Sequence, residues 1–234
     1  HEAAGVVEAV GSQVRTVKVG DHVVSCLSAF CGHCEFCVTG RMALCMGGDT
    51  RRQAGEGARL MGSNGEVVNQ MLNLSAFAEK MLIHEHACVA IDKDMPMDRA
   101  ALLGCAVTTG AGTIFNACKL VPGEVVAVIG CGGVGLAAIN SAKIAGAGRV
   151  IAVDPVPEKR ELAKILGATD TIDRNELSEP GRPMGRERWA GAIDAVGSHT
   201  LANICATTKY GGTVAACGLA QGPDLKTTVL PFIL

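Results

Sequence analysis

Residues 125–135 read VVAVIGCGGVG, an unbroken apolar run that leads into four glycines within six positions. A run without polar residues, such as 125–129, is typical of a parallel strand that is buried on both faces of a sheet. Residues 133–145 then place valine and alanine side chains at helical spacing. The glycines between the two patterns predict a tight turn from a strand into a helix.

The turn matches the pattern G-x-G-x-x-G, in which each glycine has its own steric reason. Gly130 permits the tight turn, and Gly132 allows the backbone to approach a pyrophosphate. Gly135 allows the helix to pack closely against the strand. With Gly133 and Val134 between them, these residues place free N–H groups of a helix N-terminus beside the phosphates. We therefore predict a dinucleotide site, with a glycine-rich packing turn that binds no ligand as the alternative.

An acidic residue follows at the distance that such a site requires. Asp154 ends the next predicted strand, 149–154, nineteen residues after Gly135. Its carboxylate would accept hydrogen bonds from the ribose hydroxyls and would repel a 2′-phosphate, which favours NAD over NADP. Lys159 could also reach the ribose, although an exposed lysine in the first turn of a helix is an equally good interpretation.

Strand and helix patterns continue to alternate after Asp154. A helix is expected from Pro157 to a stop at Gly167, with Leu162, Ile165 and Leu166 on one face. Further elements are expected as a strand over 190–196, a helix over 200–208 and a strand over 212–217, with 175–188 as an exposed connection. This alternation predicts an α/β fold with a doubly wound parallel sheet.

The first part of the chain, 4–91, has a different pattern. Apolar and polar residues alternate in short runs between glycines, at 5–11, 17–19 and 23–24, as half-buried antiparallel strands require. Two uncharged stretches, 100–118 and 125–142, approach spanning length but contain polar residues or clustered glycines. We therefore expect neither a membrane segment nor a signal peptide, and we expect a cytoplasmic protein.

Composition restricts the classes of partner. With 21 basic and 23 acidic side chains the formal charge is -2, so no strong attraction to nucleic acid or to an anionic membrane is expected. Hydrophobic residues at 48% are sufficient for a folded core. Eleven cysteines are many for a cytoplasmic protein, where clustered cysteines indicate metal ligands before disulfides.

Four of the cysteines form the pattern C-x2-C-x2-C-x7-C. Soft thiolate ligands at this density are what a closed tetrahedral zinc site needs, so a structural zinc is predicted at Cys31, Cys34, Cys37 and Cys45. An iron–sulfur cluster is the main alternative, but the spacing before the fourth cysteine differs from the ferredoxin pattern. Buried cysteines without metal are the other alternative. His33, between two ligands, is expected to be a solvated loop residue.

With the four-cysteine lobe preceding the dinucleotide motif, the chain resembles the zinc-dependent medium-chain alcohol dehydrogenases. Residues 1–5, HEAAG, are similar to the family motif G-H-E-x-x-G, and residues 104–110, GCAVTTG, are similar to a second family segment. The resemblance implies that His1 and Cys105 bind a catalytic zinc and that Glu2 lies behind the metal. It also implies that Thr109 contacts the nicotinamide.

The resemblance implies a two-domain fold: a GroES-like, mostly antiparallel zinc-binding domain over 1–119 and a Rossmann domain over 120–234. Both domains are expected to be incomplete, because the family's first catalytic cysteine precedes this motif and its Rossmann domain is longer. Val196 and Cys217, at the ends of later strands, are candidates to wall the nicotinamide pocket, with core packing as the simpler interpretation. Homodimers or homotetramers are implied as well.

Two branches of the family are visible. Residues 61–62 and 77–79 resemble the formaldehyde and thiol-adduct dehydrogenases, whereas 175–234 resembles the zinc-free quinone oxidoreductases and acrylyl-CoA reductases. The leading hypothesis is a zinc-dependent enzyme that transfers a hydride between an alcohol, or a hemithioacetal or aldehyde adduct, and NAD. The alternatives are a zinc-free NAD(P)H-dependent enoyl or quinone reductase, and a nucleotide-binding module without catalysis.

Overall fold

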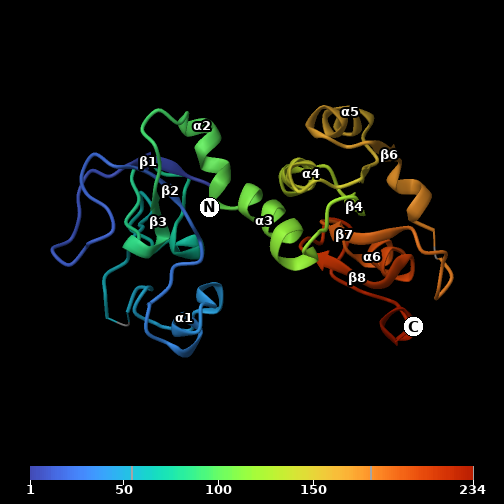
Figure 1. Ribbon diagram of the computed structural model, residues 1–234. Helices are drawn as coiled ribbons and strands as arrows, with labels where there is room; N and C mark the ends of the chain where they lie inside the picture. Colours follow the sequence, from blue (N-terminus) through green and yellow to red (C-terminus); the bar gives the residue numbers. More distant parts are fainter. Residues whose placement is uncertain (54, 180, 234) are drawn as a thin grey trace. The chain divides into compact units, whose positions relative to one another are not determined.

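A computed structural model describes residues 1–53, 55–179 and 181–233. The chain divides into two compact units, His1–Cys105 and Ala106–Leu234 (Figure 1). Each unit contains one sheet, and each is described by itself below.

The sheet of the first unit has three antiparallel strands in the order β1 (Ala4–Val6), β2 (His22–Ser25) and β3 (Cys88–Ala90). The antiparallel arrangement predicted from the alternating pattern is therefore confirmed. The strands are shorter than predicted: Val7 still pairs with Gly20 and Asp21 through backbone hydrogen bonds, and residues 8–19 form a loop. In that loop Lys18 donates its N–H to Asp21 Oδ2 at 2.9 Å, which holds 17–19 in a turn.

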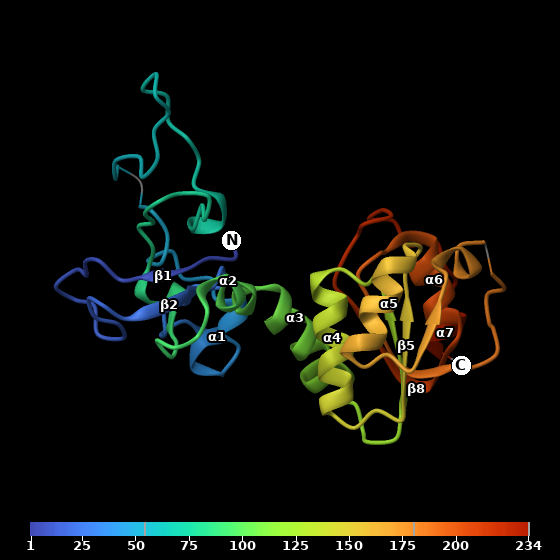
Figure 2. The ribbon, with the colours of Figure 1, turned by 90° about the horizontal axis from the view of Figure 1, so that it is seen from above.

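Short helical segments connect the strands of the first unit. They are α1 (Glu35–Val38), α2 (Met97–Ala100) and the 3₁₀ turns η1 (Met42–Leu44), η2 (Met71–Asn73), η3 (Glu85–Ala87) and η4 (Ala101–Gly104). Between η1 and η3 the chain makes a long loop, seen in teal in Figure 2, in which Met61 and Val67 form an isolated antiparallel bridge.

The second unit is built on five strands in the order β6-β5-β4-β7-β8, and every neighbouring pair is parallel. The strands are β4 (Val125–Ile129), β5 (Arg149–Val153), β6 (Asp170–Ile172), β7 (Trp189–Asp194) and β8 (Thr208–Ala216). The predicted doubly wound parallel sheet is thus confirmed (Figure 2).

Helices connect and cover these strands. They are α3 (Ala106–Gly112), which continues as the π-helical turn η5 (Thr113–Cys118), then α4 (Gly133–Ile144), α5 (Pro157–Leu166), the 3₁₀ turn η6 (Arg174–Leu177), α6 (Ser198–Ala206) and α7 (Leu230–Ile233). Helix α5 begins at Pro157 and is followed by Gly167 at φ +128°, as its start and stop residues predict.

The three apolar residues that the sequence places on one face of α5 differ in burial, and of these Leu166 packs against the apolar core. Leu162 and Ile165 are 43% and 77% exposed, whereas Ala163 is completely buried. The helix packs against α4, β5 and β6, and the small Ala163 side chain allows a close approach there. Leu162 and Ile165 lie outside the narrow side of this ten-residue helix that faces the core, which Ala163 and Leu166 occupy.

Two apolar clusters fill the faces of the parallel sheet. Val126 and Val128 belong to one cluster with Ile139 of α4, and Ala127 and Ile129 belong to the other with Ile204 of α6. Successive side chains of a strand point to opposite faces, so the two sets alternate along β4. This explains why 125–129 is apolar at every position.

Among the described residues, no single helix has the length and apolar content that would allow it to cross a membrane. One bent pair, Met97–Gly104 with Ala106–Cys118, satisfies the criterion by length and composition.

Candidate dinucleotide site and metal centres

The glycine turn lies where the order of the parallel sheet reverses. Strand β4 pairs with β5 on one side and with β7 on the other, so the chain winds outward in both directions from β4. In open α/β sheets, ligands bind in the crevice at the carboxyl ends of the strands at such a point. Gly130 begins the turn at φ +94°, a conformation that favours glycine, and its N–H donates to Val153 O at 2.7 Å.

The glycine turn has open space at Gly132, and the first N–H groups of α4 can donate to a ligand. A Cβ added at Gly132 would meet no atom within 4 Å, so the backbone there is open to a ligand. A Cβ added at Gly135 would overlap the carbonyl oxygen of Gly130, which explains why the third residue of α4 must be glycine. Leu136 donates to Gly132 O at 2.8 Å as the first turn of α4 closes. The N–H groups that precede Leu136 have no acceptor within the helix and suit a phosphate.

Asp154 holds this turn from the neighbouring strand. Its side chain is only 4% exposed, and Oδ2 accepts the Cys131 N–H at 2.8 Å. Oδ1 accepts the Val156 N–H at 2.9 Å. Each carboxylate oxygen can accept more than one hydrogen bond, so acceptor capacity remains for ribose hydroxyls. Lys159 is exposed, and its proposed contact with the ribose stays a prediction.

Sequence reasoning missed two residues that support Asp154. The Arg160 guanidinium donates to the carbonyl oxygen of Asp154 at 2.6 Å and to Asp173 Oδ2 at 3.4 Å. It therefore ties the end of β5 to the residue that follows β6. Nothing in the sequence distinguishes Arg160 from its exposed neighbour Lys159, because the pairing with Asp173 depends on the parallel register of β5 and β6.

Cys131, inside the motif, has a structural environment. The side chain is 1% exposed, and its Sγ lies 3.9 Å from Val153 O. Burial, reinforced by the nearby Asp154 carboxylate, raises the pKa of the Cys131 thiol to about 12. The thiol is therefore protonated near neutrality, and it packs as a small apolar group.

Helix α3 brings Thr109 to the same helix that carries the glycine turn. A Cβ added at Gly110 would lie 2.7 Å from Ala137 Cβ, and one added at Gly133 would lie 3.3 Å from Ala106 Cβ. Helices α3 and α4 thus pack closely through glycine and alanine. Thr109, which precedes Gly110, is half-buried beside this contact, and its role toward a nicotinamide stays a prediction.

The carboxyl end of β7 forms the other wall of the crevice. Asp194 is fully buried and accepts the N–H groups of Gly197 at 2.8 Å and Val196 at 3.3 Å. Burial raises the pKa of this carboxyl group, and the two N–H groups oppose that effect. Val196 belongs to the apolar core, and its Cγ2 atom lies 3.3 Å from the Cβ position of Gly130. Its place in the wall of a nicotinamide pocket stays a prediction. Cys217 is half-buried, and its thiol donates to Asp194 O at 3.3 Å.

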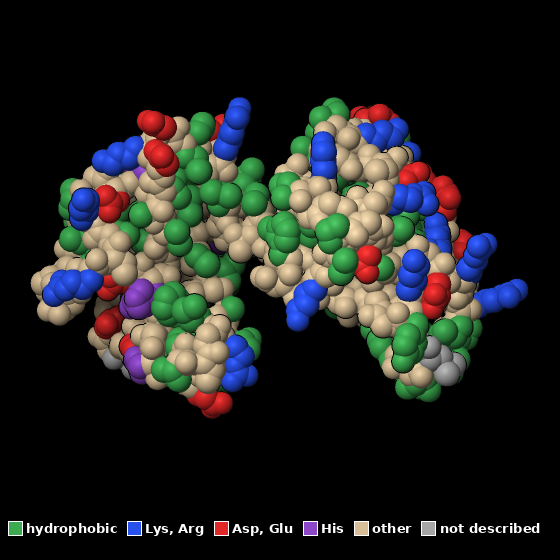
Figure 3. All heavy atoms as spheres, viewed as in Figure 1, with side chains coloured by type: hydrophobic (Ala, Val, Ile, Leu, Met, Phe, Trp, Pro, Cys, Tyr) green, Lys and Arg blue, Asp and Glu red, His purple; other side chains and the backbone are tan. Residues whose placement is uncertain are grey.

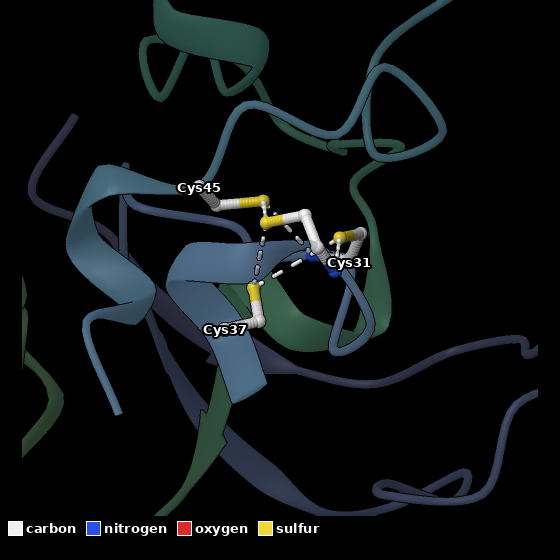
Figure 4. A group of neighbouring side chains, drawn as sticks. Cys31, Cys37 and Cys45 are labelled. Carbon is white, nitrogen blue, oxygen red and sulfur yellow. Dashed lines mark hydrogen bonds between the residues drawn. The ribbon is translucent and has the colours of Figure 1, made fainter. Parts of the chain in front are cut away.

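The four cysteines of the lobe converge in the first unit (Figure 4). Their sulfur atoms all lie within 4.8 Å of one another, with Cys34–Cys37 at 3.5 Å and both Cys31–Cys37 and Cys34–Cys45 at 3.9 Å. Four thiolates at about 2.3 Å from a tetrahedral zinc ion are about 3.8 Å apart. The residues therefore fit a closed structural zinc site.

Backbone donors prepare these sulfurs for a metal. Hydrogen bonds from the backbone of Cys37 and Met46 lower the pKa of the Cys34 thiol to about 6. The Cys31 N–H, at 3.2 Å, and the Gly47 N–H, at 3.4 Å, donate to Cys45 Sγ and lower the pKa of that thiol. Removal from water raises the pKa of Cys37 to about 12. A cation is needed to hold all four as thiolates.

A ring nitrogen of His33 lies within 4.8 Å of Cys31 Sγ and of a carboxylate oxygen of Asp49, so His33 borders the four-sulfur cluster. Its side chain is 70% exposed, and Nε2 lies 3.6 Å from Asp49 Oδ2. It is a solvated loop residue that pairs with an exposed carboxylate.

The backbone segments that carry the two predicted catalytic-zinc ligands both pass Ser25. The Ser25 hydroxyl donates to His1 O at 3.1 Å, and a Cβ added at Gly104 would contact Ser25 O and lie 3.8 Å from His1 O. Cys105 follows Gly104 directly and is half-buried. His1 Nδ1 is a buried nitrogen without a hydrogen-bond partner among the described residues. An imidazole nitrogen and a thiol are the donors that zinc prefers, so the pair suits a metal, and Glu2 is half-buried next to it.

A four-cysteine lobe that fits a structural zinc, together with a doubly wound sheet and its G-x-G-x-x-G turn, is typical of the zinc-binding dehydrogenases. Residues 1–93 match the family described as "Alcohol dehydrogenase GroES-like domain", and residues 133–233 match "Zinc-binding dehydrogenase". The chain belongs to this alcohol dehydrogenase family.

Individual relatives agree with the assignment. The chain is 34% identical to an alcohol dehydrogenase class-3 of Zea mays, over all of this chain and 64% of that protein. It is 42% identical to an S-(hydroxymethyl)glutathione dehydrogenase of Escherichia coli, over 77% of this chain and 50% of that protein. An alcohol dehydrogenase zinc-binding domain protein from Burkholderia ambifaria superposes with a TM-score of 0.85 at 32% identity, covering 100% of this chain and 65% of that one. The chain thus spans between half and about two thirds of the length of these relatives.

Proposed function

We propose that the protein is a zinc-dependent oxidoreductase that transfers a hydride between an alcohol, or a thiol adduct of an aldehyde, and NAD. The observation that carries the proposal is the Asp154 carboxylate, which lies beside the open glycine turn at the point where the sheet order reverses. The family assignment and the four converging sulfurs support it. The names of the maize and E. coli relatives support an alcohol or a thiol-adduct substrate.

The roles divide between a GroES-like region, 1–119, and a Rossmann region, 120–234. In the Rossmann region the backbone of Gly132, Gly133, Val134 and Gly135 would bind the pyrophosphate. Asp154 would accept hydrogen bonds from the adenosine ribose, with Lys159 next to it. The carboxylate would repel the 2′-phosphate of NADP, which is the reason for proposing NAD.

Other residues would orient the reacting groups. Thr109, held by the close contact of α3 with α4, would contact the nicotinamide ring, and Val196 and Cys217 would wall its pocket. His1 and Cys105 would hold a catalytic zinc, with Glu2 tuning it from behind. A zinc ion bound there supplies Lewis acidity, which lowers the pKa of an alcohol hydroxyl. Cys31, Cys34, Cys37 and Cys45 would hold the structural zinc, which is separate from the chemistry.

Measurements of turnover distinguish this function from a zinc-free reductase and from a binding module without catalysis. The zinc-loaded protein should form NADH from NAD with a short alcohol, or with formaldehyde in the presence of a thiol. A higher rate with the thiol than without it would identify the adduct as substrate. Oxidation of NADPH by an enone in metal-free protein would favour a zinc-free reductase instead. Tight binding of NAD with no turnover of any substrate would contradict an enzyme and favour a binding module.

A further inference from the structure

The loop that follows the four-cysteine lobe contains a cavity lined by cationic and amide side chains. Its volume is about 380 Å³, and it lies entirely within the first unit. Three arginines and three residues with side-chain amides are among those that line it: Arg51, Arg52, Arg59, Asn69, Gln70 and Asn73. None of these residues has a part in the zinc or dinucleotide sites.

The charge in the cavity is unbalanced. Arginine stays protonated at every pH at which proteins are folded, so three positive charges meet there. Among the described residues, Glu56 is the one carboxylate within 4 Å of any of the three, at 3.9 Å from Arg59. Its Oε2 already accepts the Gln53 N–H at 3.0 Å. At least two positive charges therefore remain without a close counter-charge from the chain.

The arginine that lies deepest is held in place by neutral groups. The Arg59 side chain is 19% exposed, and its Nη1 donates to Gln70 Oε1 at 3.2 Å. The amide nitrogen of Gln70 donates to the carbonyl oxygens of Leu74 and Leu82, which fixes the side chain of Gln70. Arg52 donates to the carbonyl oxygen of Glu56 at 3.1 Å. Several guanidinium N–H groups of this cavity are left for an external acceptor.

We propose that this cavity binds a small molecule with two or more anionic oxygens, from carboxylate or phosphate groups. Arginine is suited to these ligands because its planar N–H groups match the oxygens of a carboxylate or phosphate in pairs. Asn69 and Asn73, which also line the cavity, carry amide groups that can donate hydrogen bonds to the same oxygens. The site is independent of the proposed function, so its test uses binding and not turnover.

The experiment is isothermal titration of the full chain with inorganic phosphate and, separately, with succinate in a low-salt buffer. Arg51→Gln and Arg59→Gln remove one lining charge each. As a control, Arg99→Gln removes one positive charge at an exposed position of α2, outside the cavity. We expect saturable binding of at least one anion, and binding weaker by about tenfold in each cavity variant, which is the loss of one charge-assisted contact. Arg99→Gln should bind like the unaltered protein.

Comparing the two anions shows whether the natural ligand carries phosphate or carboxylate groups. Binding of phosphate alone indicates a phosphorylated ligand, and binding of succinate alone indicates a dicarboxylate; either result supports the site. Because Arg59 is partly buried, circular dichroism melting checks that its variant folds, and the exposed Arg51 provides the test if it does not. Absence of saturable binding by both anions would overturn the proposal. An equal loss of anion affinity in Arg99→Gln would also overturn the proposal, because general attraction between the anion and the protein's positive charge would then explain the binding.

Discussion

The Asp154 carboxylate accepts the backbone N–H of Cys131 at 2.8 Å, across the gap between β5 and the glycine turn. Its second oxygen accepts the Val156 N–H, so one buried side chain fixes both the turn and the start of the next connection. The acidic residue is generally explained by the ribose that it binds. In this protein it also supports the conformation in which the turn can receive the phosphates.

Replacement of Asp154 should therefore affect stability as well as binding. Asp154→Ala removes the acceptor of the buried Cys131 N–H and of the partly buried Val156 N–H, and it should reduce the free energy of unfolding by about 2 kcal/mol. Affinity for NADH should fall at least about tenfold, which a fluorescence titration measures. Asp224→Asn, an exposed change in the same unit, is the control. Unchanged melting of Asp154→Ala would contradict the supporting role.

Arg160 should influence the same site without touching the cofactor. Arg160→Ala removes the link between Asp154 O and Asp173, and we expect NADH to bind several-fold more weakly while zinc content stays the same. The matched control is Arg149→Gln, which breaks a more exposed ion pair with Asp170 and should cost at most about 1 kcal/mol. Equal effects of the two changes on NADH affinity would show that Arg160 has no special position.

The contact between α3 and α4 can be tested with two glycines of one helix. A Cβ at Gly110 would enter the backbone of α4, so Gly110→Ala should destabilise the protein by about 1–3 kcal/mol. Gly112 has φ −61° and open space around it, so Gly112→Ala should be neutral or stabilise by up to about 1 kcal/mol. The melting temperature of Gly110→Ala should therefore fall, whereas that of Gly112→Ala should stay the same or rise. Equal losses would place the α3–α4 contact elsewhere.

Metal analysis tests the four-sulfur site. Cys37→Ser should bind one zinc fewer per chain than the unaltered protein. When cobalt replaces the zinc, the variant should lack the thiolate-to-cobalt charge-transfer band of the unaltered protein. Cys88→Ser alters a half-buried cysteine of β3 in the same unit and should leave both readouts unchanged. Retention of the zinc in Cys37→Ser would contradict the assignment.

Alkylation of the metal-free protein should depend on pH in a residue-specific manner. Because its pKa is lowered to about 6, Cys34 is mostly thiolate at pH 7, and its reaction with iodoacetamide should slow only as the pH falls through about 6. Cys131, with a pKa raised to about 12 and a buried thiol, should stay unmodified across this range. Mass spectrometry of digested protein quantifies both. Preferential modification of Cys131 would contradict the two environments.

Prediction from the sequence worked best where one local pattern has one physical explanation. The apolar run 125–129 needs two buried faces, and the structure has two. Pro157 and Gly167 mark the ends of α5 because each restricts the backbone by itself. The convergence of four sulfurs follows from their close spacing along one loop.

Prediction failed where the outcome depends on a neighbouring element. Burial on α5 follows the small Ala163 and not Leu162 or Ile165, since the surface that α5 covers decides which side chain fits. Arg160 pairs with Asp173 through the register of two strands. The arginine cavity joins residues up to 22 positions apart in a loop whose described residues form only one isolated bridge and one short 3₁₀ turn, so no periodicity could indicate it.

Isotope transfer tests the proposed hydride chemistry most directly. The zinc-loaded protein is incubated with NAD and an alcohol that carries deuterium on the carbinol carbon. In a second reaction it is incubated with NAD, dideuterated formaldehyde and a thiol, which together form an adduct with deuterium on its carbinol carbon. Mass spectrometry of the reduced cofactor should find the deuterium on NADH, because the hydride moves directly from the carbinol carbon to the nicotinamide. Unlabelled NADH, or no NADH although NAD binds and zinc is present, would contradict the account.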